Sequence, residues 1–227
     1  MFVEQTLESY SKALASRQSV PGGGSATALA ASLGAALVSM VCHITQGDEN
    51  GDRHLAPLSD VVERSEFLRR RLLQLVDQDG QVFSEVMSIY RWPKDTPERR
   101  RERRAALQVA YRQAAEVPLQ VVEYCSEIVS LCVPAAELGN KWVVSDAGVA
   151  VLLAASCMQA ALMSVYINLK SINDAEYVRE TLERIAAAKA GLEETRDRVL
   201  ALAQERMGVT ELAGRVVDVN VERAEKE

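Results

Sequence analysis

The sequence predicts an all-α protein, a single-domain bundle of long helices that forms dimers. Apolar residues recur with helical period along nearly the whole chain, and no segment alternates with the period of a strand. Aromatic residues make up only 5% of the 227 residues while alanine is abundant, which suits closely packed helices better than sheets. Two long segments, 26–41 and 147–169, carry no charge and therefore predict two buried apolar helices.

Three helices are expected in the N-terminal half. The first covers residues 2–15 and is amphipathic, with one face formed by Leu7, Tyr10 and Leu14. The second covers residues 25–44, with Ser25 as its N-cap. The third covers residues 59–90 and ends before Pro93, because the residue that precedes a proline disfavours the helical conformation.

The C-terminal half begins with a strong start signal, because Thr96 can cap a helix whose first residue is Pro97. Helices are expected over residues 97–132, 134–139, 145–172 and 174–207, with a kink at Pro118. The helical domain is therefore assigned to residues 1–208, and residues 209–227 are expected to form a loosely ordered tail.

Composition limits the partners and the compartment. The net charge of −6 argues against bulk attraction to nucleic acid or to an anionic membrane. The first five residues lack the features of a signal peptide. Four cysteines without CxxC spacing are typical of reduced core residues in a cytoplasmic protein: Cys42, Cys125, Cys132 and Cys157.

The two uncharged segments admit a second interpretation as membrane spans, since the later one is long enough to cross a bilayer. That segment also contains Ser156, Gln159 and Asn168, each of which is costly in lipid. We therefore favour two buried helices, part of whose cover comes from a second subunit in a homodimer.

The run Gly22-Gly23-Gly24-Ser25 is a candidate binding loop. Three consecutive glycines cost backbone entropy, which a fold tolerates where φ is positive or where another group approaches closely. The first N–H groups of the following helix would then face an anion or a polar ring. A glycine turn that lets two helices pack closely is the alternative, and the motif alone leaves both open.

Few other residues suggest chemistry. The two histidines, His43 and His54, have no second ligand at metal spacing, so no metal site is expected. The arginine-rich run 99–104 alternates with Glu102 in an acidic chain, so it is either a solvated face or an anion site.

Two carboxylates stand out. Asp79 lies in the middle of a helix among residues patterned for the interior, where burial would raise its pKa and suit it to acid–base work. Asp146 lies at a helix start, where the helix dipole alone could account for it.

Several stretches, in this order and at these separations, together resemble the formiminotetrahydrofolate cyclodeaminase / methenyltetrahydrofolate cyclohydrolase family. They are Pro21 to Ala26, Gly34 to Cys42, Asp79 with Phe83, Val86 and Met87, Pro93 to Thr96, Ala115 to Leu119, Gly139-Asn140 with Ser145 to Ala150, and Tyr166 to Lys170. The resemblance covers roughly residues 4–207. It implies a cytoplasmic, all-helical enzyme, dimeric or built from dimers, that acts on a tetrahydrofolate derivative as its substrate without a metal or other cofactor.

The resemblance also implies roles for particular residues. Asp79 is the first choice for the general acid or base, and Asp146 is the second carboxylate or an anchor for the pterin. The remaining substrate contacts are implied for the glycine loop with Ser25, for Asn140 and Ser145, and for Lys94 and Lys170, which would meet the glutamate carboxylates of the folate.

Two departures from the family pattern leave the substrate open. Asp48-Glu49-Asn50 stands where a lysine-rich turn is usual, and Lys141-Trp142 stands where small or amide residues are usual. Hydrolysis of 5,10-methenyltetrahydrofolate to 10-formyltetrahydrofolate, or the related formimino cyclodeamination, is the leading hypothesis. A paralogue acting on another folate-like or amidine-containing substrate, and a non-catalytic helical oligomer, are the alternatives.

Overall fold

The computed structural model describes residues 1–47 and 56–208, and every regular element in those ranges is helical. After a 3-10 turn, η1 (Phe2–Glu4), the elements are α1 (Leu7–Leu14), α2 (Gly23–Gln46), α3 (Ala56–Tyr90), α4 (Pro97–Leu138), α5 (Val144–Leu169), α6 (Ala175–Lys189) and α7 (Leu192–Arg206). The all-α prediction is confirmed. The expected tail, 209–227, and the turn at Asp48-Glu49-Asn50 lie outside the described residues.

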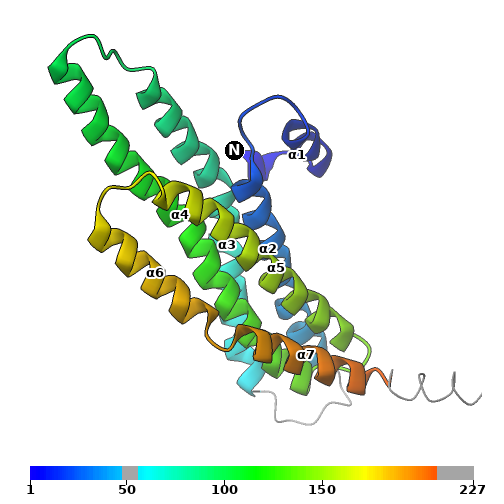
Figure 1. Cartoon of the computed structure of the whole chain (residues 1–227). Coiled ribbons are helices and arrows are strands. Elements are labelled where there is room, and N and C mark those ends of the chain that lie inside the picture. The colour runs from blue at the N-terminus through cyan, green and yellow to red at the C-terminus, as the bar shows by residue number, and fades with distance from the viewer. Residues whose placement is uncertain (48–55, 209–227) are drawn as a thin grey trace, which may run out of the picture.

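Four long helices form the body of the molecule. α3 and α4 make a long antiparallel hairpin, and α2 and α5 pack against it and against each other (Figure 1). α6 and α7 lie along α4, and α7 also contacts α5. The core between the four helices is aliphatic and alanine-rich, with fully buried side chains that include Ala35, Val38, Leu72, Val122 and Met158.

The start of α4 is as predicted, and its end is not. The Thr96 side chain accepts a hydrogen bond from the backbone N–H of Arg99, and Pro97 is the first helical residue. The helix then continues through Pro118 and Pro134 to Leu138, instead of stopping near residue 132. Buried residues near each proline hold the helix together where one backbone N–H is missing: Val117 and Leu119 beside Pro118, and Cys132 and Ala135 near Pro134.

Two other boundaries differ from the prediction. The expected helix 174–207 is two helices, because Gly191 adopts φ +68° between α6 and α7. The apolar period continues across this break, so the pattern did not reveal it. The first predicted helix is only Leu7–Leu14, and of its expected apolar face only Tyr10 is buried.

The helices that contain the two uncharged segments, α2 and α5, are buried on one face only. Their inner faces belong to the core, while their outer faces expose Leu33, Leu152, Met163 and Ile167, the last two at 69% and 71%. One chain therefore covers only part of each helix, and the expected cover by a second subunit stays a prediction. By length and composition alone, α2, α4 and α5 could each cross a membrane, although about half of each apolar stretch is packed inside the bundle.

All four cysteines are free and buried. Burial raises the pKa of the Cys42 and Cys157 thiols to about 11. The interpretation of these residues as reduced core side chains agrees with their positions.

Candidate active site

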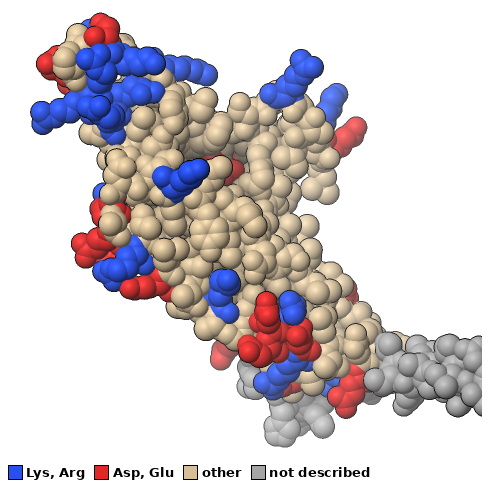
Figure 2. Space-filling view, viewed as in Figure 1, with Lys and Arg blue, Asp and Glu red and all other residues tan. Residues whose placement is uncertain are grey.

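A hollow of about 420 Å³ lies where the first turn of α2 meets the C-terminal third of α3 and the last turns of α5. Its wall includes all three glycines of the loop, Asp79 and Asn168. Figure 2 shows this face of the molecule, with acidic atoms at the bottom of a recess and basic side chains on both sides of it.

Asp79 is held by the start of α2. The backbone N–H of Ser25 donates a hydrogen bond of 2.9 Å to Oδ2 of the carboxylate. Burial raises the pKa of Asp79, and the Ser25 N–H offsets part of that rise. Among the described residues, no lysine or arginine forms an ion pair with this carboxylate. The raised pKa and the absence of an ion pair fit a group that exchanges protons.

The glycine loop differs from the predicted binding loop. α2 begins at Gly23 with Gly22 as N-cap, so Ser25 is not the cap; its buried hydroxyl instead shares a hydrogen bond of 3.0 Å with Tyr10. None of the three glycines has a positive φ. The close approach occurs at Gly24, where a Cβ would lie 2.1 Å from Oδ1 of Asp79. The N-terminus of α2 thus binds the side chain of Asp79, where the sequence predicts an anion or a polar ring of a ligand.

The structure does not bring Asp146 to Asp79 within one chain. Asp146 lies in the first turn of α5, while the hollow includes Ser164 and Asn168 near the other end of the same helix. From Asp146 to Asn168 the helix rises about 33 Å. Asn140 and Ser145 lie beside Asp146, and the backbone N–H of Asn140 donates to the Thr45 hydroxyl at the far end of α2. The predicted two-carboxylate site is therefore split between the two ends of the bundle.

The predicted cations, Lys94 and Lys170, do not line the hollow but lie close in sequence to residues that do. Lys170 follows α5 directly and precedes Ser171, which lines the hollow. Lys94 lies in the connection between α3 and α4, close in sequence to Tyr90, another lining residue. The guanidinium of Arg103 lies 5.1 Å from the centre of the Tyr90 ring, so part of the arginine-rich start of α4 borders the same opening.

Three side chains of the hollow were missed as functional candidates. The hydroxyls of Tyr90 and Tyr111 share a hydrogen bond, and burial together with that bond raises the pKa of Tyr111 to about 12. The Asn168 amide donates to the carbonyl oxygens of Ala114 and Ser164. Helical period predicts such tyrosines as core residues, and only the position of Asn168 in a motif with Lys170 pointed to it.

The remaining predicted features lie elsewhere. Trp142 is 80% exposed, and the Lys141 ammonium lies 5.0 Å from the centre of its ring. Within residues 1–47 and 56–208, no three His, Cys, Asp or Glu side chains gather as metal ligands would. The hollow therefore offers one partly desolvated carboxylate, two phenols and an amide.

Comparison with known proteins gives consistent results. Residues 6–187 match the family described as Formiminotransferase-cyclodeaminase. Methenyltetrahydrofolate cyclohydrolase from Methylorubrum extorquens is 41% identical over 82% of this chain and 91% of that protein. Formimidoyltransferase-cyclodeaminase from Rattus norvegicus is 33% identical over 82% of this chain, and the match spans only 34% of the rat protein. The crystal structure of formiminotetrahydrofolate cyclodeaminase from Thermotoga maritima superimposes with a TM-score of 0.79 at 27% identity, covering 88% of this chain and 96% of that one.

Proposed function

Because the chain belongs to the formiminotransferase-cyclodeaminase family, we propose that it hydrolyses 5,10-methenyltetrahydrofolate to 10-formyltetrahydrofolate in the Asp79 hollow. It is an enzyme of the cyclohydrolase or cyclodeaminase type in folate one-carbon chemistry. The cyclohydrolase reaction is favoured because the Methylorubrum cyclohydrolase is 41% identical to this chain, whereas the Thermotoga cyclodeaminase is 27% identical. The observation that carries the proposal is the partly buried carboxylate of Asp79, which the Ser25 N–H holds in the wall of the hollow.

The chemistry suits such a carboxylate. The substrate has an amidinium cation that bridges N5 and N10, and Asp79 would stabilise its positive charge. Water adds to the bridging carbon and gives one proton to Asp79. The bond from this carbon to N5 then breaks as the new hydroxyl becomes the formyl carbonyl, and N5 takes up a proton. The formyl group stays on N10, and the net reaction releases one proton to solvent.

The wall of the hollow supports an assignment of the other contacts. Gly22, Gly23 and Gly24 leave an open wall against which the pterin or the aminobenzoyl ring can lie. Ser25 acts through its N–H, as the group that positions Asp79. Lys94 and Lys170, at the edge, would meet the glutamate carboxylates of the folate, and the neighbouring arginines of α4 would add positive charge there.

We also propose that the active unit is a homodimer. The exposed apolar side chains of α5 recur at helical spacing along its whole length, at Val149, Leu152, Met163 and Ile167, and the adjacent face of α2 exposes Leu33. An antiparallel pairing of these faces in two subunits would place Asn140, Ser145 and Asp146 of one subunit beside the hollow of the other. The second carboxylate would then be supplied by the partner.

The location and the cofactor requirement belong to the same proposal. Four unpaired, buried thiols support a reducing compartment, and we place the enzyme in the cytoplasm. Water and a carboxylate are sufficient for the proposed proton transfers, so we expect activity to survive extensive dialysis against a chelator.

Mixing the purified protein with methenyltetrahydrofolate and following loss of the substrate chromophore tests the reaction. We expect a rate well above the uncatalysed one, and a fall of about a hundred- to ten-thousand-fold for Asp79→Asn, because the proton acceptor is lost. Asp146→Asn is expected to weaken affinity more than turnover. Full turnover by Asp79→Asn would refute the assignment of the base.

Cyclodeamination is the second candidate, favoured by the similarity to the Thermotoga cyclodeaminase. In that reaction N10 attacks the formimino carbon of the substrate, and ammonia leaves from the same kind of tetrahedral carbon. Ammonia release from 5-formiminotetrahydrofolate distinguishes it from hydrolysis. If neither folate reacts, the chain acts on another amidine-containing substrate.

A further inference from the structure

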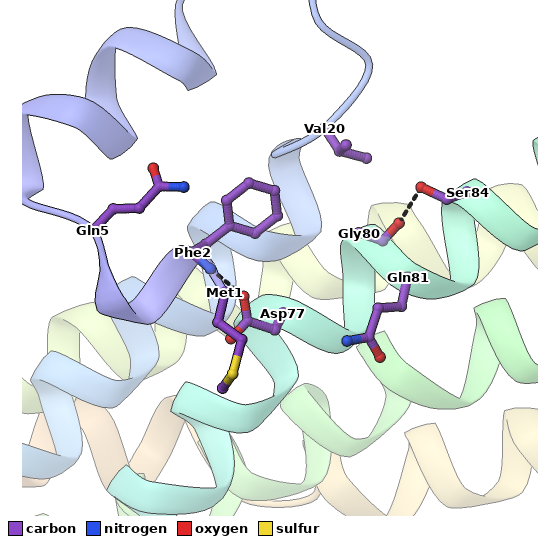
Figure 3. A pocket seen from close by; sticks show the side chains of 8 residues that line it. All are labelled: Met1, Phe2, Gln5, Val20, Asp77, Gly80, Gln81 and Ser84. Carbon is purple, nitrogen blue, oxygen red and sulfur yellow. Dashed lines mark hydrogen bonds between the residues drawn. The ribbon is translucent and has the colours of Figure 1, made fainter.

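A second cavity, of about 530 Å³, lies between the N-terminal turn η1 and α3 (Figure 3). Its lining includes Phe2, Gln5, Asp77 and Gln81. Asp79 is not part of it, although the two carboxylates are only two positions apart on α3. The proposed reaction leaves this cavity without a role.

Asp77 is the unusual residue of the cavity. Its side chain is 7% exposed, and the backbone N–H of Phe2 donates to Oδ1. The other oxygen, Oδ2, is buried and has no hydrogen-bond partner among the described residues. No described lysine or arginine forms an ion pair with it either. A buried carboxylate oxygen without a donor is unfavourable, and it favours a ligand that brings one.

The surroundings indicate which kind of donor fits. Figure 3 shows the Asp77 carboxylate beneath Met1 and Phe2, with the Gln81 amide directed toward the same space and the Gln5 amide across the Phe2 ring. The Phe2 ring forms a flat apolar wall, which Gly80 makes possible, because a Cβ there would lie 3.0 Å from that ring. A flat apolar wall beside a carboxylate oxygen without a donor suits a planar group with N–H donors at its edge, and the Gln5 and Gln81 amides are further polar groups near it.

We propose that this cavity binds a planar amidine or guanidine group, with Asp77 accepting its N–H donors. Oδ1 already accepts from the Phe2 N–H, so one charge-assisted N–H donor of the group would satisfy Oδ2, with a small movement of the Met1–Phe2 turn that covers this oxygen. The group could belong to a separate small molecule or to the cyclic guanidine at the pterin end of a folate. Only the second source rests on the proposed function.

Benzamidine is a suitable probe, with benzamide as its uncharged control of the same shape. Calorimetric titration of the full chain should detect benzamidine binding and much weaker benzamide binding. Asp77→Asn should weaken benzamidine binding by about tenfold or more, because the charge is lost while the size is kept. Glu85→Gln, an exposed carboxylate further along α3, is the matched control and should change binding less than about twofold.

Two further variants separate a loss of binding from a loss of folding and from binding in the Asp79 hollow. Gln81→Ala alters an exposed side chain and should weaken benzamidine binding while the melting temperature stays unchanged. This variant therefore tests binding in the cavity even if Asp77→Asn fails to fold. Asp79→Asn should bind benzamidine normally, whatever happens to folate turnover. Benzamidine binding that depends on Asp79 instead of Asp77 would place the probe in the other hollow and overturn the proposal.

The source of the group is decided by competition. Saturation with 5-formyltetrahydrofolate should abolish benzamidine binding if the pterin occupies the cavity, and should leave it intact if a separate small molecule does. If benzamidine does not bind at all, the buried oxygen is satisfied by water, and the proposal is wrong.

Discussion

Gly24 is the residue that allows α2 to hold Asp79. A Cβ at this position would lie 2.1 Å from Oδ1 of Asp79, whereas a Cβ at Gly23 would meet nothing within 4 Å. We therefore expect Gly24→Ala to displace the carboxylate and to reduce turnover strongly. Gly23→Ala should leave the carboxylate in place, so its kcat should stay near that of the natural protein, while its methyl group projects into the hollow and affects KM alone. The variant should also slightly stabilise the helix, since alanine is the better helix former. Steady-state kinetics and thermal melts of both variants test this, and an equal fall of kcat in the two would contradict it.

The raised pKa of Asp79 predicts how stability depends on pH. Because burial disfavours the charged form, ionised Asp79 destabilises the folded state above its folded pKa, and this cost vanishes below the unfolded value of 3.8. Asp79→Asn should therefore be more stable than the natural protein at neutral pH, and the difference should shrink as the pH falls. Denaturant unfolding at several pH values measures it; a destabilised variant at neutral pH would refute the desolvation argument.

Single residues of the site were only partly predictable. The choice of Asp79 rested on a carboxylate among residues patterned for the interior, and the structure places it in a hollow. The partner of that carboxylate, the Ser25 N–H, could not be predicted, because the sequence suggests a side-chain cap and the backbone group acts instead. Asp77 was passed over because its contact is with Phe2, seventy-five residues away along the chain.

Among the elements, the α6–α7 break depends on one glycine. Gly191 has φ +68°, a conformation that costs other residues about 1–2 kcal/mol. Gly191→Ala should lower the free energy of unfolding by about 1 kcal/mol and leave turnover unchanged, because no residue of α6, α7 or their connection lines the hollow. Urea unfolding beside the chromophore assay measures both. A continuous helix with undiminished stability would contradict the argument.

Helix ends were predicted well where side chains set them and poorly where packing did. Thr96 and Pro97 mark the start of α4 in the sequence, and the structure agrees. Pro134 suggested a break that packing around Ala135 overrides, since local preference is weaker than tertiary burial.

For the whole molecule, the outer faces of α2 and α5 predict self-association. Met163 is 69% exposed in an uncharged stretch of α5 and does not line the hollow. Met163→Glu should therefore convert the proposed dimer to a monomer and weaken the affinity for folate more than turnover, because the partner's Asp146 would be lost. Light scattering with the activity assay tests this, and Glu180→Gln on the exposed side of α6 is a control. A natural protein that remains monomeric at micromolar concentration would remove the basis for a shared site.

The four buried thiols make it possible to measure how often the interior of the bundle becomes exposed to solvent. Their burial, with the raised pKa of Cys42 and Cys157, leaves almost no reactive thiolate in the closed state. A maleimide can then modify these thiols only when the surrounding helices move apart. The labelling rate therefore measures how often the interior is exposed. A ligand bound in the hollow contacts α2, α3 and α5 together and should therefore lower the rate of maleimide labelling.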